Sequence, residues 1–549
     1  MSTGGQQLGG GGVYLLDYGA GNVRSVCNAV AVAGVSLNFI RSADDFDKAD
    51  KLIFPGVGSF GACMHRLEEL GYIEPLRAFI ASGRPYLGIC LGMQTLFKGS
   101  EESPGIEGLG VIDSTISRFQ VPDHLAVPHM GWNGVNPRQS SKVLEEAGAS
   151  SKFYFVHSFL ALPTRGTAAW ALTTTNYGIE FVSSVCKGNV LATQFHPEKS
   201  GQAGLRLIKQ FLLQDSPSEA GSADMVVTPN PPPTNLAPRL IACLDVRTND
   251  HGDLVVTKGD QYDVREKDSR NVRNLGKPVD LAARYYTDGA DEVTFLNITS
   301  FRDSPLRDQP MLEVLRKTSE RVFVPLTIGG GIRDVTDPDG TPHTALEVAS
   351  EYFRSGADKV SIGSDAVLIT EQFLRTGVKT GKSSIEQISH VYGAQAVVIS
   401  VDPRRVYVAS PDDTKHHTIK TQVPGPNGEA YCWYQCTIKG GREPRDIDAY
   451  ELARTCEELG AGEILLNCMD KDGTNSGYDL ELIADIVDAV SIPVIASSGA
   501  GKVEHFSACL RTAKPAAVLA AGIFHREEVP IQQVKQHLSE CGFETRPVE

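Results

Sequence analysis

The sequence predicts an α/β protein in two parts, an open α/β sheet domain followed by a (β/α)8 barrel. Three observations indicate this. Short apolar stretches alternate with helix-like stretches over most of the 549 residues, as in parallel sheets covered by helices. A proline-rich segment interrupts this pattern after residue 213. Beyond it, eight alternating units fill about 310 residues, and the second four repeat features of the first four.

Composition is that of an ordinary globular protein. Apolar residues make up 41% and charged residues 22%, enough for two or three domains. The net charge of −15 argues against general binding to nucleic acids or membrane surfaces. No apolar stretch reaches membrane-spanning length, and the start of the chain lacks a signal-peptide pattern. Eleven scattered cysteines suggest neither a disulfide framework nor a zinc site, so we expect a cytoplasmic location.

Residues 13–213 are predicted to form the open sheet domain, after a flexible glycine-rich tail over 1–12. Alternating strands and helices imply a parallel sheet whose sites lie at the carboxyl ends of its strands. The expected strands are 13–17, 51–54, 84–87, 154–159 and 190–195.

Cys90 stands at the turn between the third of these strands and a helix-like stretch over 93–97. Gly88 and Gly92 flank it, and such small residues allow a tight bend and the close approach of a substrate. Free N–H groups at the start of a helix favour a thiolate. We therefore predict a nucleophile, with a buried structural cysteine as the alternative.

His196 and Glu198 supply the partners that a cysteine nucleophile needs. They follow the strand over 190–195, and Pro197 holds them close together. A thiol nucleophile requires a base, and the base requires an acceptor that orients it. Structural packing of His196 and solvation of Glu198 are the separate alternatives, but their joint position at a strand end favours a triad with Cys90.

The second strand ends in the loop 55–60, which reads Pro-Gly-Val-Gly-Ser-Phe. Such a loop can turn backbone N–H groups toward a developing oxyanion. The alternative is an ordinary connection between a strand and a helix.

The stretches 55–58, 88–94 and 194–199 resemble the three signatures of class I, triad-type glutamine amidotransferases, and 128–133 and 154–158 resemble the subgroup that serves histidine biosynthesis. The resemblance implies that the cysteine attacks the side-chain amide of glutamine, that a thioester forms as ammonia leaves, and that water then releases glutamate. The residues that it implies for binding glutamine and the oxyanion are Gly56, Val57, Gly58, Leu91 and Gln94.

Residues 214–238 are predicted to be an extended linker. Serine, proline and asparagine dominate them, so they cannot bury a core. The linker would hold two domains at high effective concentration. The second domain is then expected to span 239–549.

Eight apolar stretches of this second domain are the predicted barrel strands. Residues 289–297 match 460–467, and 325–330 match 493–499, which indicates two similar half-barrels. The predicted strands are 240–245, 292–298, 322–328, 359–363, 396–402, 463–468, 493–497 and 516–521.

Asp245 and Asp402 end the first and the fifth of these strands, at equivalent positions of the two halves. Active sites of such barrels lie at the carboxyl ends of the strands. Two opposed carboxylates can give and take a proton on either side of a substrate. The alternative is that each carboxylate caps a turn.

Glycine-rich loops follow strands three and seven, and short loops follow strands four and eight. Backbone N–H groups in such loops bind phosphate, and the repeat implies two phosphate sites on opposite rims. We predict a substrate with a phosphate at each end, over which Lys258 closes. The predicted phosphate-binding residues are Gly330, Gly331, Gly363, Ser364, Ser498, Gly499, Ala521 and Gly522.

The barrel resembles the cyclase of imidazole glycerol phosphate synthases through 241–246, 329–332, 356–362 and 470–479. Glutaminase and cyclase in one chain resemble the fused, eukaryotic-type enzymes of histidine biosynthesis. The resemblance implies that ammonia and a doubly phosphorylated ribulosyl-formimino aminoimidazole carboxamide ribotide give imidazole glycerol phosphate and aminoimidazole carboxamide ribotide. It makes the two aspartates the acid–base pair, adds Asp472 and Gly473 to the substrate site, and requires no metal or redox cofactor.

Two stretches depart from that family. The loop after strand seven often reads Ser-Gly-Gly, whereas here Ser498 replaces the first glycine. The stretch 403–440 is long and polar, and it is either a lid or a solvated hairpin.

Four charged residues stand at the starts of barrel strands, on the face opposite the catalytic one. They are Arg239, Glu292, Lys359 and Glu463. Ammonia released to water would be protonated, so an enclosed route between the sites is expected. The family resemblance implies that these residues form a gate, with Lys199 and Asp358 as partners across the domain interface. The alternative is a purely structural ion network.

Three functions remain to be weighed. The first is the ammonia-coupled synthase, which would be monomeric because one chain holds both activities. The second is an isomerase-type sugar-phosphate barrel, against which the fused glutaminase argues. The third is a non-catalytic phosphosugar-binding protein, against which the intact triad and aspartate pair argue.

Overall fold

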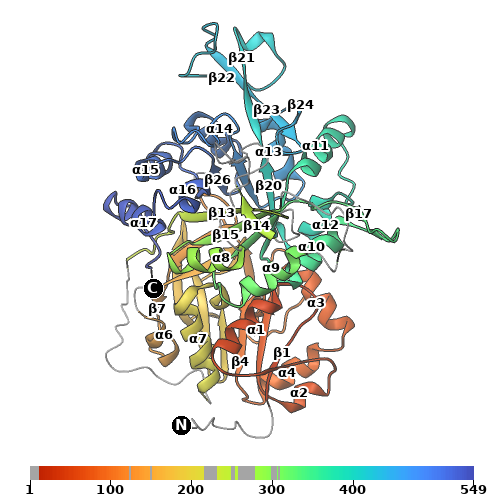
Figure 1. Ribbon diagram of the computed structural model, residues 1–549. Helices are drawn as coiled ribbons and strands as arrows, with labels where there is room; N and C mark the ends of the chain where they lie inside the picture. Colours follow the sequence, from red (N-terminus) through yellow and green to blue (C-terminus); the bar gives the residue numbers. More distant parts are fainter. Residues whose placement is uncertain are drawn as a thin grey trace. The chain divides into compact units, whose positions relative to one another are not determined.

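The computed structural model describes residues 12–122, 125–148, 151–214, 232–248, 254–257, 278–297, 306 and 310–548. Contacts divide the chain into two compact units (Figure 1). One comprises Met1–Pro122 and Asn133–Leu236, and the other comprises Asp123–Trp132 and Ala237–Glu549. Residues 1–11 of the predicted tail and 215–231 of the predicted linker lie outside the described residues, whereas Gly12, predicted as the end of the tail, is the first residue of a strand.

The first unit is built on a ten-stranded sheet in which β2, β1, β3, β4, β12, β11, β10 and β7 follow one another. The strands from β2 to β12 pair in parallel, and β10 and β11 pair antiparallel. Strand β4 is buried along its whole length, as expected for a central parallel strand. The strands are β1 (Gly12–Leu15), β2 (Leu37–Phe39), β3 (Ala49–Gly56), β4 (Tyr86–Cys90), β5 (Ile116–Arg118), β7 (Asn136–Pro137), β9 (Phe159–Ala161), β10 (Ala171–Tyr177), β11 (Ile179–Lys187) and β12 (Val190–Thr193).

The strand predicted over 154–159 is two strands, β8 (Lys152–His157) and β9, because the chain turns at Ser158. Two helices, α1 (Val23–Val32) and α3 (Phe60–Glu69), begin directly after Asn22 and Ser59, whose side chains cap their first turns. The remaining elements of this part are β6 (His129–Gly134), α1 (Val23–Val32), α2 (Asp45–Lys48), α3 (Phe60–Glu69), α4 (Ile73–Ala81), α5 (Leu91–Gln94), α6 (Lys142–Ala147), η1 (Pro197–Lys199) and α7 (Gly201–Leu213).

The second unit is a closed parallel barrel, as predicted. Each strand pairs with the next, and β27 pairs with β13 to close the ring. The barrel strands are β13 (Arg239–Thr248), β15 (Glu292–Asn297), β16 (Leu326–Gly329), β19 (Lys359–Ile362), β20 (Val397–Val401), β25 (Glu463–Asn467), β26 (Val494–Ser497) and β27 (Ala517–Ala520). Strand β16 begins later than the predicted 322–328, directly after Pro325, which has no N–H for a ladder.

Helices surround the barrel (Figure 1). They are α8 (Pro278–Thr287), α9 (Pro310–Ser319), α10 (Ala345–Arg354), α11 (Ser364–Thr376), α12 (Ser384–Tyr392), α13 (Ala449–Glu458), α14 (Leu480–Ala489), α15 (Val503–Thr512), α16 (Gly522–His525) and α17 (Ile531–Glu540). None of the helices in the described ranges is long and apolar enough to cross a membrane.

The polar stretch after the fifth strand forms its own four-stranded antiparallel sheet, which projects from the barrel (Figure 1). Arg405 fastens this sheet to the loop after β25 through a bidentate ion pair with Asp479 at 2.7–2.9 Å. The stretch is an antiparallel hairpin, but several of its side chains are buried rather than solvated, among them Cys432 and Cys436. Its action as a lid stays a prediction. Its strands, and the smaller strands on the barrel rim, are β21 (Pro403–Val408), β22 (Ile419–Lys420), β23 (Tyr431–Ile438), β24 (Glu443–Asp448), β14 (Leu254–Thr257), β17 (Val335–Thr336) and β18 (Pro342–His343), with the short helices η3 (Ala394–Ala396) and η4 (Pro411–Asp413).

Candidate active sites

Cys90 lies at a strained turn between β4 and α5. Its φ of 54° and ψ of −103° are unusual for any residue but glycine. A Cβ atom on Gly92 would lie 1.9 Å from the carbonyl oxygen of Phe54, and one on Gly88 would lie 2.6 Å from that of Gly92. Only glycine therefore fits at positions 88 and 92, two residues before and two residues after the cysteine. The helix starts at Leu91 and is short, whereas the sequence predicted helix over 93–97.

His196 and Glu198 are paired as the sequence predicts. Nδ1 of His196 lies 2.8 Å from Oε1 of Glu198, and both side chains are buried. Burial alone would lower the pKa of His196, but the Glu198 carboxylate and the nearby Cys90 sulfur outweigh it and raise the pKa well above its ordinary value. Nε2 of His196 is buried and has no hydrogen-bond partner among the described residues. The imidazole is thus oriented at one nitrogen and available at the other.

Two glutamines lie beside the cysteine. Nε2 of Gln94 donates to Oε1 of Gln194 at 3.0 Å, and Nε2 of Gln194 donates to Sγ of Cys90 at 3.5 Å. The sequence predicted a role for Gln94 but none for Gln194. The only signal was that Gln194 opens the 194–199 stretch that carries the histidine and the glutamate.

The 55–58 loop passes directly beside Cys90. Gly56 is the register partner of Cys90 in the pairing of β3 with β4. The carbonyl of Val57 accepts a hydrogen bond from the hydroxyl of Tyr18 at 2.5 Å, and Gly58 has a φ of 99°. The loop is therefore held on its carbonyl side, next to the nucleophile.

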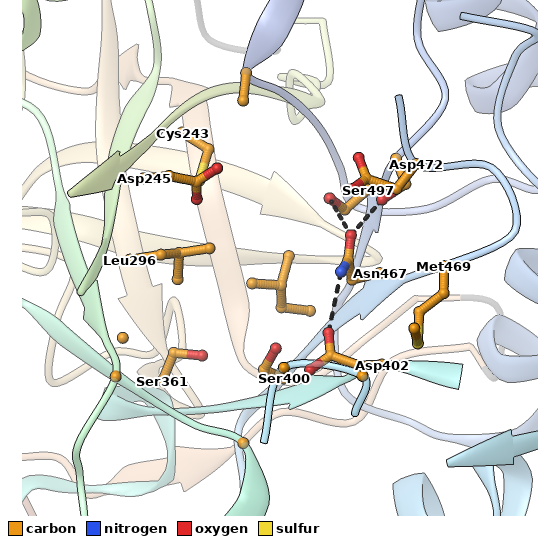
Figure 2. Close-up of a pocket in the computed structure, with 18 of the residues that line it drawn as sticks. Cys243, Asp245, Leu296, Ser361, Ser400, Asp402, Asn467, Met469, Asp472 and Ser497 are labelled. Atoms are coloured by element: carbon orange, nitrogen blue, oxygen red, sulfur yellow. Dashed lines mark hydrogen bonds between the residues drawn. The ribbon is translucent and has the colours of Figure 1, made fainter. Parts of the chain in front are cut away.

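A cavity of about 700 Å³ opens at the carboxyl ends of the barrel strands. Asp245 and Asp402 both line it (Figure 2). Asp245 lies in β13 and Asp402 directly follows β20, and these two strands are on opposite sides of the closed sheet. Lys258 lies outside the described residues. Ten predicted substrate-binding and phosphate-binding residues all line the cavity: Gly330, Gly331, Gly363, Ser364, Asp472, Gly473, Ser498, Gly499, Ala521 and Gly522.

The surroundings of Asp402 shift the pKa of its carboxyl group. Burial raises the pKa of its carboxyl, a hydrogen bond from Asn467 opposes this, and Asp472 adds to it, so that the pKa lies above its ordinary value. The bond runs from Nδ2 of Asn467 to Oδ1 of Asp402 at 3.1 Å (Figure 2). Asn467 was missed in the sequence, although it matches Asn297 in the barrel repeat.

In the loop after β26, Ser498 stands where the family pattern has a glycine. Ser498 takes a positive φ of 74°, and its hydroxyl donates to Oδ1 of Asn467. A Cβ on Gly499 would lie 2.3 Å from the carbonyl of Gly477. The serine is thus held by a hydrogen bond in a backbone region that favours glycine.

Arg239, Glu292, Lys359 and Glu463 form a buried ring at the amino ends of the barrel strands. Arg239 bonds Glu292 at 2.7 Å and also bonds Glu463, while Lys359 bonds Glu292 at 2.7 Å and Glu463 at 2.6 Å. All four side chains are at most 2% exposed. Burial alone would raise the pKa of Glu292, but the Lys359 and Arg239 cations lower it.

Lys199 and Asp358 belong to different units. Lys199 is buried in η1, and Oδ2 of Asp358 accepts a hydrogen bond from the N–H of Leu326 at 2.8 Å. Their predicted pairing stays a prediction. Within the described ranges, no group of three or more His, Cys, Asp or Glu residues is arranged to hold a metal ion.

Comparison with known families identifies both parts of the chain. A family model described as "Glutamine amidotransferase class-I" matches residues 14–214, and one described as "Histidine biosynthesis protein" matches residues 239–530. The chain is thus a class I glutamine amidotransferase joined to a histidine-biosynthesis barrel.

Three full-length relatives narrow this class. "Imidazole glycerol phosphate synthase hisHF, chloroplastic" of Arabidopsis thaliana is 57% identical over 97% of this chain and 89% of its own length. Proteins named "Imidazole glycerol phosphate synthase hisHF" of Emericella nidulans and Schizosaccharomyces pombe are 54% and 56% identical, over 98% and 96% of this chain and 99% and 98% of their own lengths. This chain belongs to the bifunctional imidazole glycerol phosphate synthase family, and it serves histidine biosynthesis.

Proposed function

We propose that this chain hydrolyses glutamine in its first unit and uses the ammonia in its barrel. There, ammonia and the doubly phosphorylated ribulosyl-formimino aminoimidazole carboxamide ribotide give imidazole glycerol phosphate and aminoimidazole carboxamide ribotide. The observation that carries this proposal is that one chain holds both a buried thiol–imidazole–carboxylate site and a cavity with two opposed carboxylates.

Glutamine hydrolysis begins with attack of the Cys90 thiolate on the carbon of the side-chain amide. The C–N bond breaks as His196 gives its proton to the leaving nitrogen, so ammonia departs and a thioester remains. His196 then takes a proton from water, which cleaves the thioester to glutamate and restores the thiolate. Glu198 stabilises the imidazolium and orients the ring.

The oxyanion of each tetrahedral intermediate is bound by backbone N–H groups of the 56–58 loop and of Leu91, while Gln94 holds the substrate. Support comes from the register of Gly56 beside Cys90 and from the start of α5 at Leu91. Such donors stabilise charge that develops only in the transition state.

Ring formation takes place between Asp245 and Asp402. Ammonia adds to the substrate carbonyl and water leaves to give an imine; the formimino bond then breaks and the ring closes. Each step moves protons, which the two carboxyl groups give and take. The pKa of Asp402 lies above its ordinary value because the carboxyl is buried, which favours its protonated, proton-donating form.

The two phosphates bind on opposite rims of the cavity. Gly330, Gly331, Gly363 and Ser364 take one phosphate, whereas Ser498, Gly499, Ala521 and Gly522 take the other, through backbone N–H groups. Asp472 and Gly473 contact the substrate, and Lys258 closes over it. The close backbone packing at Gly330 and Gly499 supports this, because a side chain there would displace the loops.

Ammonia enters the barrel through the ion-pair ring at its floor, with Lys199 and Asp358 as partners between the two units. Burial of the ring supports a closed floor that opens only during transfer. The enzyme acts as a monomer, since one chain holds both activities, and its compartment is the cytoplasm.

Two substitutions test this function. Cys90→Ala should abolish product formation from glutamine but keep the reaction with ammonium salts, because only the ammonia source is lost. Asp402→Asn should stop both reactions, because ring formation itself is blocked. The measurement is product formed with each nitrogen source. Glutamine-dependent turnover by Cys90→Ala, or normal cyclisation by Asp402→Asn, would contradict the assignment.

A further inference from the structure

Gln194 directly follows β12 and precedes His196 by two residues, and it is completely buried at 0% exposure. Its amide contacts the nucleophile on one side and Gln94 on the other, at 3.5 and 3.0 Å. It is therefore a third polar neighbour of the reacting sulfur, besides the imidazole and the backbone of the elbow.

The direction of these bonds follows from the backbone carbonyl of Phe159, which can only accept. Nε2 of Gln94 lies 3.3 Å from this oxygen, so the NH2 group of Gln94 faces it. The second hydrogen of the same group then points at Gln194, which must present its oxygen. The NH2 group of Gln194 is left facing Cys90.

An N–H aimed at sulfur favours the anion over the thiol, since hydrogen bonding to the charged form stabilises that form. Bonds to charged groups are about twice as strong as neutral ones, and low local polarity increases their effect. Among the described residues, His196 and Tyr18 are titratable groups that interact with Cys90. His196 must also exchange protons during turnover, whereas an amide keeps its hydrogens throughout.

We propose that Gln194 is a further catalytic residue, which donates a hydrogen bond to Sγ of Cys90 and stabilises the thiolate before attack and again when the thioester is cleaved. Phe159 and Gln94 set the orientation of its amide. This role rests on the proposed glutaminase reaction, and it adds to it a donor that the triad does not contain.

Gln194→Glu tests the donor with little change of shape. The ionised carboxylate still accepts from Gln94 but has no hydrogen for the sulfur, and its negative charge also disfavours the thiolate, so the uncharged Gln194→Leu variant below isolates the loss of the donor. The measurement is the rate at which iodoacetamide alkylates Cys90, followed by mass spectrometry of the peptide across a range of pH. We expect the rate at neutral pH to fall about 10- to 100-fold, and the half-maximal rate to move to higher pH. An unchanged pH profile would overturn the proposal.

Gln194→Leu removes both hydrogen bonds and should give the same direction of change. Asn189→Asp is the matched control, because this amide donates to the carbonyls of Ile80 and Arg84 at 2.9 and 2.7 Å, at the other end of the sheet strands. Its alkylation profile should equal that of the unaltered protein. An unchanged thermal unfolding transition of each variant shows that the first unit is folded, and retained ammonia-dependent cyclisation shows the same for the barrel.

The same experiment separates this role from the triad itself. Alkylation of the unaltered protein should abolish glutamine hydrolysis, and if it does not, the assignment of Cys90 as nucleophile fails. If alkylation inactivates but both Gln194 variants react as the unaltered protein does, only the role of Gln194 fails. We also expect kcat for glutamine hydrolysis to fall with the alkylation rate in both variants, and a normal kcat would count against the proposal.

Discussion

At the scale of single residues, each of the two reaction sites contains a side-chain amide that donates a hydrogen bond to the reacting group. Gln194 contacts the sulfur of Cys90, and Asn467 contacts the carboxyl of Asp402. Both amides lie at or next to the end of a strand and both are linked onward, to Gln94 and to Ser498. An amide can donate without changing its own charge, so it shifts a proton equilibrium without taking part in it.

Asn467→Leu should raise the pKa of Asp402 further, because the hydrogen bond that favours the ionised carboxyl is lost. The limb of the pH profile that Asp402 controls should then move to higher pH. The measurement is ammonia-dependent cyclisation with the concentration of uncharged ammonia held constant. Ser497→Ala is the control, because it removes a hydroxyl that lies 3.5 Å from Oδ1 of Asn467 but leaves the bond from Asn467 to Asp402. Its pH profile should equal that of the unaltered protein. A limb that stays in place would show that Asn467 does not adjust Asp402.

At the scale of elements, both sites depend on turns that only glycine allows. The elbow at Cys90 places two glycines against backbone oxygens, and the loop after β26 does the same at Gly499. In each case the strand supplies rigidity and the turn supplies backbone N–H groups at the strand end. Local sequence therefore predicted where these turns lie.

Gly499→Ala should raise KM for the doubly phosphorylated substrate about tenfold or more, because its Cβ would lie 2.3 Å from the carbonyl of Gly477 and displace the loop. Gly340→Ala is a matched control, since Gly340 also has a positive φ, 91°, but nothing lies within 4 Å of its Cβ. It should cost about 1 kcal/mol of stability and leave KM unchanged. Steady-state kinetics with ammonium as the nitrogen source measures KM in both variants, and thermal unfolding measures their stability. Equal KM values in the two variants would contradict the phosphate site.

Prediction from sequence succeeded where one local pattern determines the structure. The strand ends, the spacing from His196 to Glu198 and the repeat of the half-barrels all lie within short stretches. It missed Gln194 and Asn467, because their importance depends on contacts between residues distant in the chain. It left the 403–440 stretch open, because the fold of this stretch depends on pairing between distant residues, such as Arg405 with Asp479.

At the scale of the whole molecule, the chain divides its chemistry between two units that can each be described alone. The first releases a reagent, and the second consumes it. The barrel separates its own functions by face, since the carboxylates and glycine loops lie at one end of the strands and the buried ion ring lies at the other. Joining glutamine hydrolysis to ring formation in one chain is an advantage only if the ammonia passes between the two sites without equilibrating with the surrounding water.

The most direct test of the central claim follows the nitrogen atom. The protein is supplied with glutamine labelled with 15N in its side-chain amide, together with an excess of unlabelled ammonium, and the label in imidazole glycerol phosphate is measured by mass spectrometry. At saturating glutamine, we predict that the unaltered protein gives product whose label is undiluted. Cys90→Ala should give product without label, made from the surrounding ammonium. Label diluted to the ratio of the surrounding ammonium would contradict transfer within the enzyme.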